Sequence, residues 1–203
     1  MIRSLIVGAV ALALVACSGA KQQTTQSPQA GGAQTFRVAF DTSRGPFVVE
    51  VDPALAPNGA ARFAELVKAK YFDGARFYRV VPNFVVQWGA AANPKVTKKW
   101  DVPIPDDPVK TSNVRGTITF AATNAPNSRT THLFINLADN ANLDAMGFAP
   151  IGRVVSGMTT VDHIYSGYGE QPDQSLISQS GNAYLQKAFP RLDYIKTARI
   201  VGS

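Results

Sequence analysis

The chain has 203 residues, of which 45% are hydrophobic and 17% charged, with a formal net charge of +6. This length and composition indicate one globular domain with some chain left over, because a disordered chain would carry more charge and fewer apolar residues. A single cysteine with two histidines excludes disulfide scaffolds, zinc modules and iron–sulfur proteins, so we expect no metal. The basic residues form no block with interleaved aromatic residues, so we expect no nucleic-acid partner.

The N-terminal residues have the pattern of a targeting segment. After Arg3, residues 5–16 form an unbroken apolar run, which is shorter than the roughly 20 residues that cross a bilayer as a helix. It therefore fits a secretory signal, and we predict a signal peptide over residues 1–16.

The run ends Leu14-Val15-Ala16-Cys17, which resembles the lipobox of bacterial lipoproteins, whose cysteine receives lipid. We predict that the protein contacts the membrane through lipidated Cys17; an ordinary signal peptide with an incidental cysteine is the alternative. Because Ser18 and not aspartate follows, the resemblance favours the bacterial cell envelope at the periplasmic face of the outer membrane.

A polar linker follows. Residues 18–35 are rich in Gln, Thr, Ser, Gly and Ala and have no apolar periodicity, so this segment cannot bury enough surface to order itself. We predict a lipidated cysteine and flexible tether over residues 17–35 and a folded domain over residues 36–203.

Short runs rich in β-branched and aromatic residues dominate the folded part. They predict strands over residues 36–41, 47–51, 77–81, 84–89, 116–121, 133–136, 149–154 and 194–201. Apolar residues at helical spacing predict a helix to about residue 69, beginning after Pro57-Asn58-Gly59, and a second over residues 158–165. Residues 92–113 and 166–181 are predicted loops. The fold class is mainly β, a closed eight-stranded antiparallel β-barrel capped by two α-helices.

The stretch 77–89, FYRVVPNFVVQWG, carries the candidate chemistry. By the two-residue period of a strand, Phe77, Arg79 and Val81 share one face, Val85 and Gln87 share a face on the next strand, and Phe84, Val86 and Trp88 share its other face. An arginine among apolar residues is costly when unpaired. It either pairs with an acid or lines a groove in which it meets a ligand, and the residues alone leave both open.

This stretch resembles the cyclophilin signature F-[HY]-R-[IV]-[IV]-P-x-F-x-x-Q-x-G. Other stretches also agree with the family, in its order along the chain: PNGAARFAELV before the signature, and GTITFAATN, HLFINLADNANLD and IGRVVSGMTTVD after it. The resemblance implies a cyclophilin-like domain with peptidyl-prolyl cis-trans isomerase activity, proline-containing polypeptides as partners, no cofactor and a monomer.

The resemblance also implies roles for individual residues. Arg79 matches the catalytic arginine and Gln87 its supporting glutamine. The remaining matched positions bind substrate: Phe84, Val85, Ala121, Ala122, His132, Phe134, Asn142, Leu143 and Phe148.

Several of these positions depart from the family pattern. Val85 replaces a frequent methionine, His132 a glutamine, Phe148 a common histidine, and Asn142 the tryptophan that assists cyclosporin binding. Trp88 and Ala90 replace glycine and aspartate in the tail of the signature. These changes put substrate preference and drug binding in doubt more than the reaction, and we expect weak cyclosporin affinity.

We therefore expect an isomerase that assists the folding of exported proteins. A non-catalytic scaffold or adhesin that holds proline-containing segments is the alternative, and a barrel that carries a small ligand is a third reading. The enzymatic reading requires Arg79 to lie beside Phe84 and Phe134 and to be free of an internal ion pair.

Overall fold

The computed structural model describes residues 34–202; the predicted signal peptide, Cys17 and nearly all of the tether lie outside them. All eight predicted strands are present, with bounds that differ by a few residues. They are β1 Phe36–Thr42, β2 Gly45–Val51, β3 Arg79–Val81, β4 Val85–Trp88, β5 Thr117–Phe120, β6 Leu133–Asn136, β7 Pro150–Ser156 and β8 Ile195–Val201. They form one antiparallel sheet in the order β3-β4-β6-β5-β7-β2-β1-β8.

The prediction of a closed barrel is wrong. β3 and β8 are the two edges of the sheet, and no ladder joins them among the described residues. The chain before β3 meets the start of β8 in an isolated bridge, Arg76 to Tyr194, and in a few backbone hydrogen bonds, among them Phe77 N–H to the Asp193 carbonyl at 3.0 Å and Ile195 N–H to the Ala75 carbonyl at 2.8 Å. β3 is too short to extend this contact into a ladder. The sheet is therefore a curled half-barrel.

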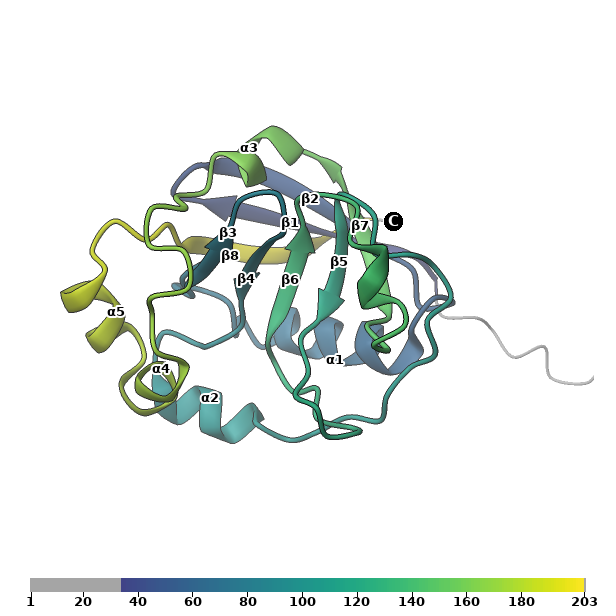
Figure 1. Cartoon of the computed structure of the whole chain (residues 1–203), viewed down its shortest axis with the longest axis horizontal. Coiled ribbons are helices and arrows are strands. Elements are labelled where there is room, and N and C mark those ends of the chain that lie inside the picture. Colours follow the sequence, from purple (N-terminus) through teal and green to yellow (C-terminus); the bar gives the residue numbers. More distant parts are fainter. Residues whose placement is uncertain (1–33, 203) are drawn as a thin grey trace, which may run out of the picture. The chain divides into compact units, whose positions relative to one another are not determined.

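Both predicted helices are present, at opposite ends of the strands (Figure 1). α1 spans Pro57–Lys68 and α3 spans Met158–Asp162. Phe63 and Leu66 of α1 and Val161 of α3 are buried in the same cluster as the inner face of the sheet. α1 begins where the sequence supplies Pro57 at its start, a position at which the missing N–H of proline costs nothing.

Three further helices lie in segments for which no helix was predicted: α2 Pro94–Trp100, α4 Gln174–Ser180 and α5 Asn182–Ala188. They are short and bury few residues, so no apolar period marks them. Side-chain caps begin two of them: Asn93 accepts from the Lys95 N–H at 3.0 Å, and Asp173 accepts from the Ser175 N–H at 2.7 Å. In the described part of the chain, no helix combines the length and apolar character needed to span a membrane.

The interior of the curled sheet is filled with side chains. Phe40, Phe47, Val86, Trp88 and Ile118 are all buried in the main cluster, and the Phe40 and Phe47 rings stack with centroids 4.6 Å apart. A small ligand would have to displace these residues. The filled core therefore argues against a ligand-carrying barrel.

A second, smaller cluster holds the C-terminal helices against the outside of the sheet. Tyr78 and Ala90 pack there against Ile177 of α4 and Leu185 of α5. Gly181 joins the two helices at φ +53°, where a Cβ atom would come within 2.7 Å of the Ala92 carbonyl oxygen. Tertiary contact therefore explains why helices form where a loop was predicted.

Candidate active site

A groove of about 640 Å³ lies on the outer side of the sheet. β4 and β6 form its floor, and the register of the strands explains which side chains reach it. Val86 and Trp88 point into the main core, so the alternate residues Val85 and Gln87 face outward. Gln87 lies opposite Phe134 of β6. The predicted face shared by Val85 and Gln87 is therefore the groove side of the strand.

Two predicted side-chain directions are wrong. Phe77 was placed on the face of Arg79, but it is buried in the main core, because β3 begins only at Arg79 and strand alternation does not hold before it. Phe84 was placed on the face of Val86 and Trp88, but it packs beside Val85 at the groove. Phe84 precedes β4 and follows Asn83, whose φ of +59° turns the chain.

The floor of the groove is apolar. Val85, Phe134 and Leu143 are buried there, with Phe84 and Phe148 packed against them. The Phe134 and Phe148 rings meet edge to face, with centroids 5.7 Å apart. These side chains form an apolar slot with aromatic walls.

Arg79 extends over one end of this slot. Its guanidinium carbon lies 5.5 Å from the centre of the Phe84 ring. Its Nη1 donates to Oε1 of Gln87 at 3.1 Å, and its Nε donates to Oε1 of Glu170 at 2.6 Å. Arg79 therefore lines the groove and is also one member of an ion pair, so both alternatives that the sequence left open are true at once.

The expectation that Arg79 is free of an ion pair is wrong. The pair is, however, a water-exposed one, since the Glu170 side chain is 61% exposed and that of Arg79 24%. Exposed ion pairs contribute only about 0–1 kcal/mol, which is too little to sequester the guanidinium. A guanidinium has five N–H donors, so donors remain for a ligand.

A chain of hydrogen bonds orients Gln87 beneath Arg79. Because arginine can only donate, the Gln87 oxygen must face Arg79, and its Nε2 then donates to the Tyr78 hydroxyl at 3.0 Å. The Tyr78 oxygen lies 2.7 Å from Nδ1 of His132, and in the tautomer with its proton on Nε2 that nitrogen accepts from the tyrosine hydroxyl. Burial raises the pKa of Tyr78, which keeps the hydroxyl protonated as this chain requires.

The position of His132 depends on a close backbone approach. A Cβ atom on Gly89 would lie 2.2 Å from the His132 Cα, so the end of β4 and the residues before β6 are in direct contact. Burial lowers the pKa of His132. Its imidazole is therefore neutral near pH 7 and able to accept from Tyr78.

This lowered pKa predicts a pH dependence of stability. Because folded His132 binds a proton less tightly than unfolded His132, its contribution to stability is complete above the ordinary histidine pKa of about 6.5 and is lost as the pH falls below it. The loss has a slope of at most about 1.4 kcal/mol per pH unit. Urea unfolding of the wild type and His132→Gln at pH 7.5 and 5.5 measures it, and we expect the glutamine variant to lose less stability on acidification.

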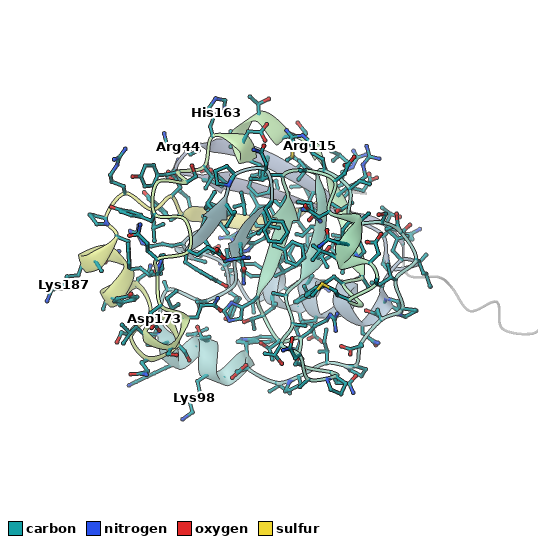
Figure 2. The ribbon with its side chains drawn as sticks, viewed as in Figure 1. Arg44, Lys98, Arg115, His163, Asp173 and Lys187 are labelled. Atoms are coloured by element: carbon teal, nitrogen blue, oxygen red, sulfur yellow. The ribbon has the colours of Figure 1, made fainter. Side chains whose placement is uncertain are left out.

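His163, the other histidine, provides the matched control. It is exposed on the outside of the protein (Figure 2). If His163→Gln changes the pH dependence as much as His132→Gln does, the effect does not come from the groove and the prediction is wrong.

A buried polar network supports the wall that carries Leu143 and Phe148. The Asn113 side chain donates to Oδ1 of Asp144 and to the Phe148 carbonyl, both at 2.7 Å, and Thr119 of β5 donates to Asn113 at 2.9 Å. Hydrogen bonds from Ser112 and Asn113 hold the pKa of Asp144 below its ordinary value. The network ties the loop after the 3-10 turn Ala141–Leu143 to the sheet.

The structure brings together nearly all the predicted site residues. Those lining the groove are Arg79, Phe84, Val85, Gln87, Ala121, Ala122, His132, Phe134, Leu143 and Phe148. Asn142 does not line it: the residue is exposed on the 3-10 turn, whose geometry turns Leu143 inward instead.

The sequence analysis missed other lining residues. They are Asp101, Thr123, Ser128, Thr130, Met146, Glu170 and Gln174. Most lie in loops, and Asp101, Glu170 and Gln174 lie in or next to segments predicted as loops, so no pattern placed them near Arg79. Tyr78 was visible in the signature, but its hydrogen bonds to Gln87 and to the distant His132 appear only in the folded structure.

Comparison with known proteins supports the resemblance. Residues 37–180 match the family model of the cyclophilin type peptidyl-prolyl cis-trans isomerases. The chain belongs to this family. Peptidyl-prolyl cis-trans isomerase A of Dickeya dadantii is 34% identical over 146 residues, which are 70% of this chain and 77% of that protein. An isomerase of Acinetobacter baylyi is 36% identical over 132 residues, which are 63% of this chain and 70% of that protein.

Solved structures show the same fold. A cyclophilin type isomerase of Cryptosporidium parvum superimposes with a TM-score of 0.63 and 19% identity, covering 84% of this chain and 99% of that one. The same protein has been solved in the presence of the dipeptide Ala-Pro. This cyclophilin therefore has isomerase relatives by sequence and the cyclophilin half-barrel by structure.

Proposed function

We propose that this cyclophilin catalyses rotation about Xaa-Pro bonds with Arg79 as the catalytic donor. Amide resonance opposes the rotation with a barrier of about 18–20 kcal/mol. When the bond is twisted, the prolyl nitrogen regains a lone pair. A fixed guanidinium aimed at that nitrogen stabilises the twisted state more than the planar one, and this difference is what catalysis requires.

The groove holds this donor in place and also supplies a seat for the proline ring. Val85, Phe134 and Leu143 form an apolar seat for the proline ring, and Phe84 lies under the guanidinium. Gln87, oriented by Tyr78, holds the guanidinium from below. The observation that carries the proposal is the position of Arg79 over this slot.

The test is an exchange measurement on the full chain. Two-dimensional NMR of an Ala-Pro peptide follows cis–trans interconversion, which takes about 10–100 s without a catalyst. We expect exchange to accelerate at catalytic protein concentrations. Tight binding without acceleration would instead support the non-catalytic scaffold.

We further propose that the protein acts on exported proteins at the periplasmic face of the outer membrane, as a monomer attached through lipidated Cys17. The support is the sequence alone: the apolar run, the lipobox-like Leu14-Val15-Ala16-Cys17 and the polar linker. In a two-membrane bacterium, Cys17→Ser is expected to move the protein from the membrane fraction to the soluble fraction. An unchanged fractionation of that variant would contradict the anchor.

A further inference from the structure

Glu170 places a carboxylate at the rim of the groove, directly on the guanidinium of Arg79. Its Oε1 accepts from Nε of Arg79 and lies 2.6 Å from Nη2. The contact is held by the backbone, because the preceding residue, Gly169, accepts a hydrogen bond from the Val80 N–H of β3 at 3.2 Å. Glu170 is thus fixed beside Arg79 although its side chain is 61% exposed.

The groove is consequently negative, although the chain as a whole has a net charge of +6. Among the described lining residues the charged ones are Arg79, Asp101 and Glu170. Glu170 compensates Arg79, while Asp101 has no ion-pair partner among the described residues.

No other cation among the described residues lines the groove. Arg129, whose guanidinium carbon lies 5.8 Å from the centre of the Phe148 ring, is paired with Asp106 outside it. Lys98 and Lys99 of α2 precede Asp101, but neither lines the groove, and Lys98 points away from the protein (Figure 2). A bound peptide therefore meets more negative than positive charge from the lining side chains.

We propose that Glu170 is a specificity-determining residue that makes the isomerase favour proline segments flanked by Lys or Arg over segments flanked by Asp or Glu. The inference rests on the proposed function, which places the prolyl bond at Arg79. Consecutive Cα atoms are about 3.8 Å apart. The residues on either side of a proline bound at Arg79 therefore lie within the roughly 8–10 Å of the groove's charged side chains over which charges interact at physiological salt. Because Glu170 neutralises Arg79, the remaining charge of the lining residues is that of Asp101, which repels an acidic neighbour and attracts a basic one.

The test compares three peptides that differ only beside the proline: Ala-Lys-Pro-Lys-Phe, Ala-Glu-Pro-Glu-Phe and Ala-Ala-Pro-Ala-Phe. We expect wild-type kcat/KM, measured by NMR exchange on the full chain, to be about fivefold higher for the lysine peptide than for the glutamate peptide at low salt. In Glu170→Gln, which keeps an oxygen acceptor for Arg79, this ratio is expected to fall to about one or below.

The ratio of kcat/KM between the lysine and glutamate peptides distinguishes a role of Glu170 in specificity from a role in positioning Arg79. If Glu170 only positioned Arg79, Glu170→Gln would change all three peptides by the same factor, and that result would overturn the proposal, as would equal wild-type rates for the two charged peptides. Glu65→Gln is the matched control, because Glu65 is also 61% exposed and paired with an arginine but does not line the groove. We expect it to keep the wild-type ratio.

The salt dependence provides a second readout. In 1 M salt the screening length falls to about 3 Å, so the wild-type ratio is expected to approach one. A ratio that is unchanged by salt would contradict an electrostatic origin. Failure of the enzyme on the neutral peptide as well would count against the proposed function itself, which keeps the two failures distinguishable.

Discussion

Replacing Arg79 with alanine is expected to lower kcat/KM for an Xaa-Pro peptide by at least about tenfold, which corresponds to about 1.4 kcal/mol of lost transition-state stabilisation. The guanidinium is the only cation among the described residues that line the groove, so no described lining side chain can replace it. Its ion-pair partner Glu170 is 61% exposed, so losing the pair should change the free energy of unfolding little. NMR exchange measures the activity, and far-UV circular dichroism with urea unfolding measures the fold.

Two further variants sharpen this test. Arg79→Lys keeps the charge but loses the planar set of donors that contacts Gln87 and Glu170 together, so it should remain well below the wild type. Arg37→Ala removes an exposed arginine that is also paired with a glutamate, Glu50, and should keep full activity. Wild-type turnover by the folded Arg79→Ala protein would remove Arg79 from the mechanism.

Replacing Trp88 with alanine is expected to give the largest loss of stability, about 3–5 kcal/mol. Trp88 is fully buried, and its ring lies 5.9 Å from that of Phe40 and 5.7 Å from that of Phe77, edge to face in both contacts. It joins β4 to the strands on the other side of the core. Urea unfolding followed by circular dichroism, which does not depend on tryptophan fluorescence, measures the loss.

Trp88→Phe and Trp100→Ala are the matched comparisons. The Trp88 indole N–H has no hydrogen-bond partner within residues 34–202, so phenylalanine removes an unsatisfied donor and should cost less than alanine. Trp100 is only partly buried against the core, so Trp100→Ala should also cost less. A Trp88→Ala protein as stable as either would show that the core does not depend on this side chain.

The strand pattern could be predicted because it is local. Alternation along a strand such as Val85–Trp88 is a property of the extended backbone, and it places Val86 and Trp88 in the core and Val85 and Gln87 in the groove. The resemblance to the signature supplied the roles of Arg79 and Gln87. Phe77 and Phe84 were assigned to the wrong faces because each lies just outside a strand, where the turn at Asn83 and the short β3 end the alternation.

The sequence by itself determined the strand-rich half of the fold and the resemblance to the family, because strand alternation and the signature at residues 77–89 are both properties of neighbouring residues; the residues of the aromatic slot followed only from the resemblance. Only the tertiary structure decided that the sheet stays open, that Gln174–Ser180 forms a helix within a predicted loop, and that Glu170 meets Arg79 from 91 residues away. These features depend on packing and charge pairing between distant segments. Such contacts have no period and no fixed spacing, so no pattern along the chain predicts them.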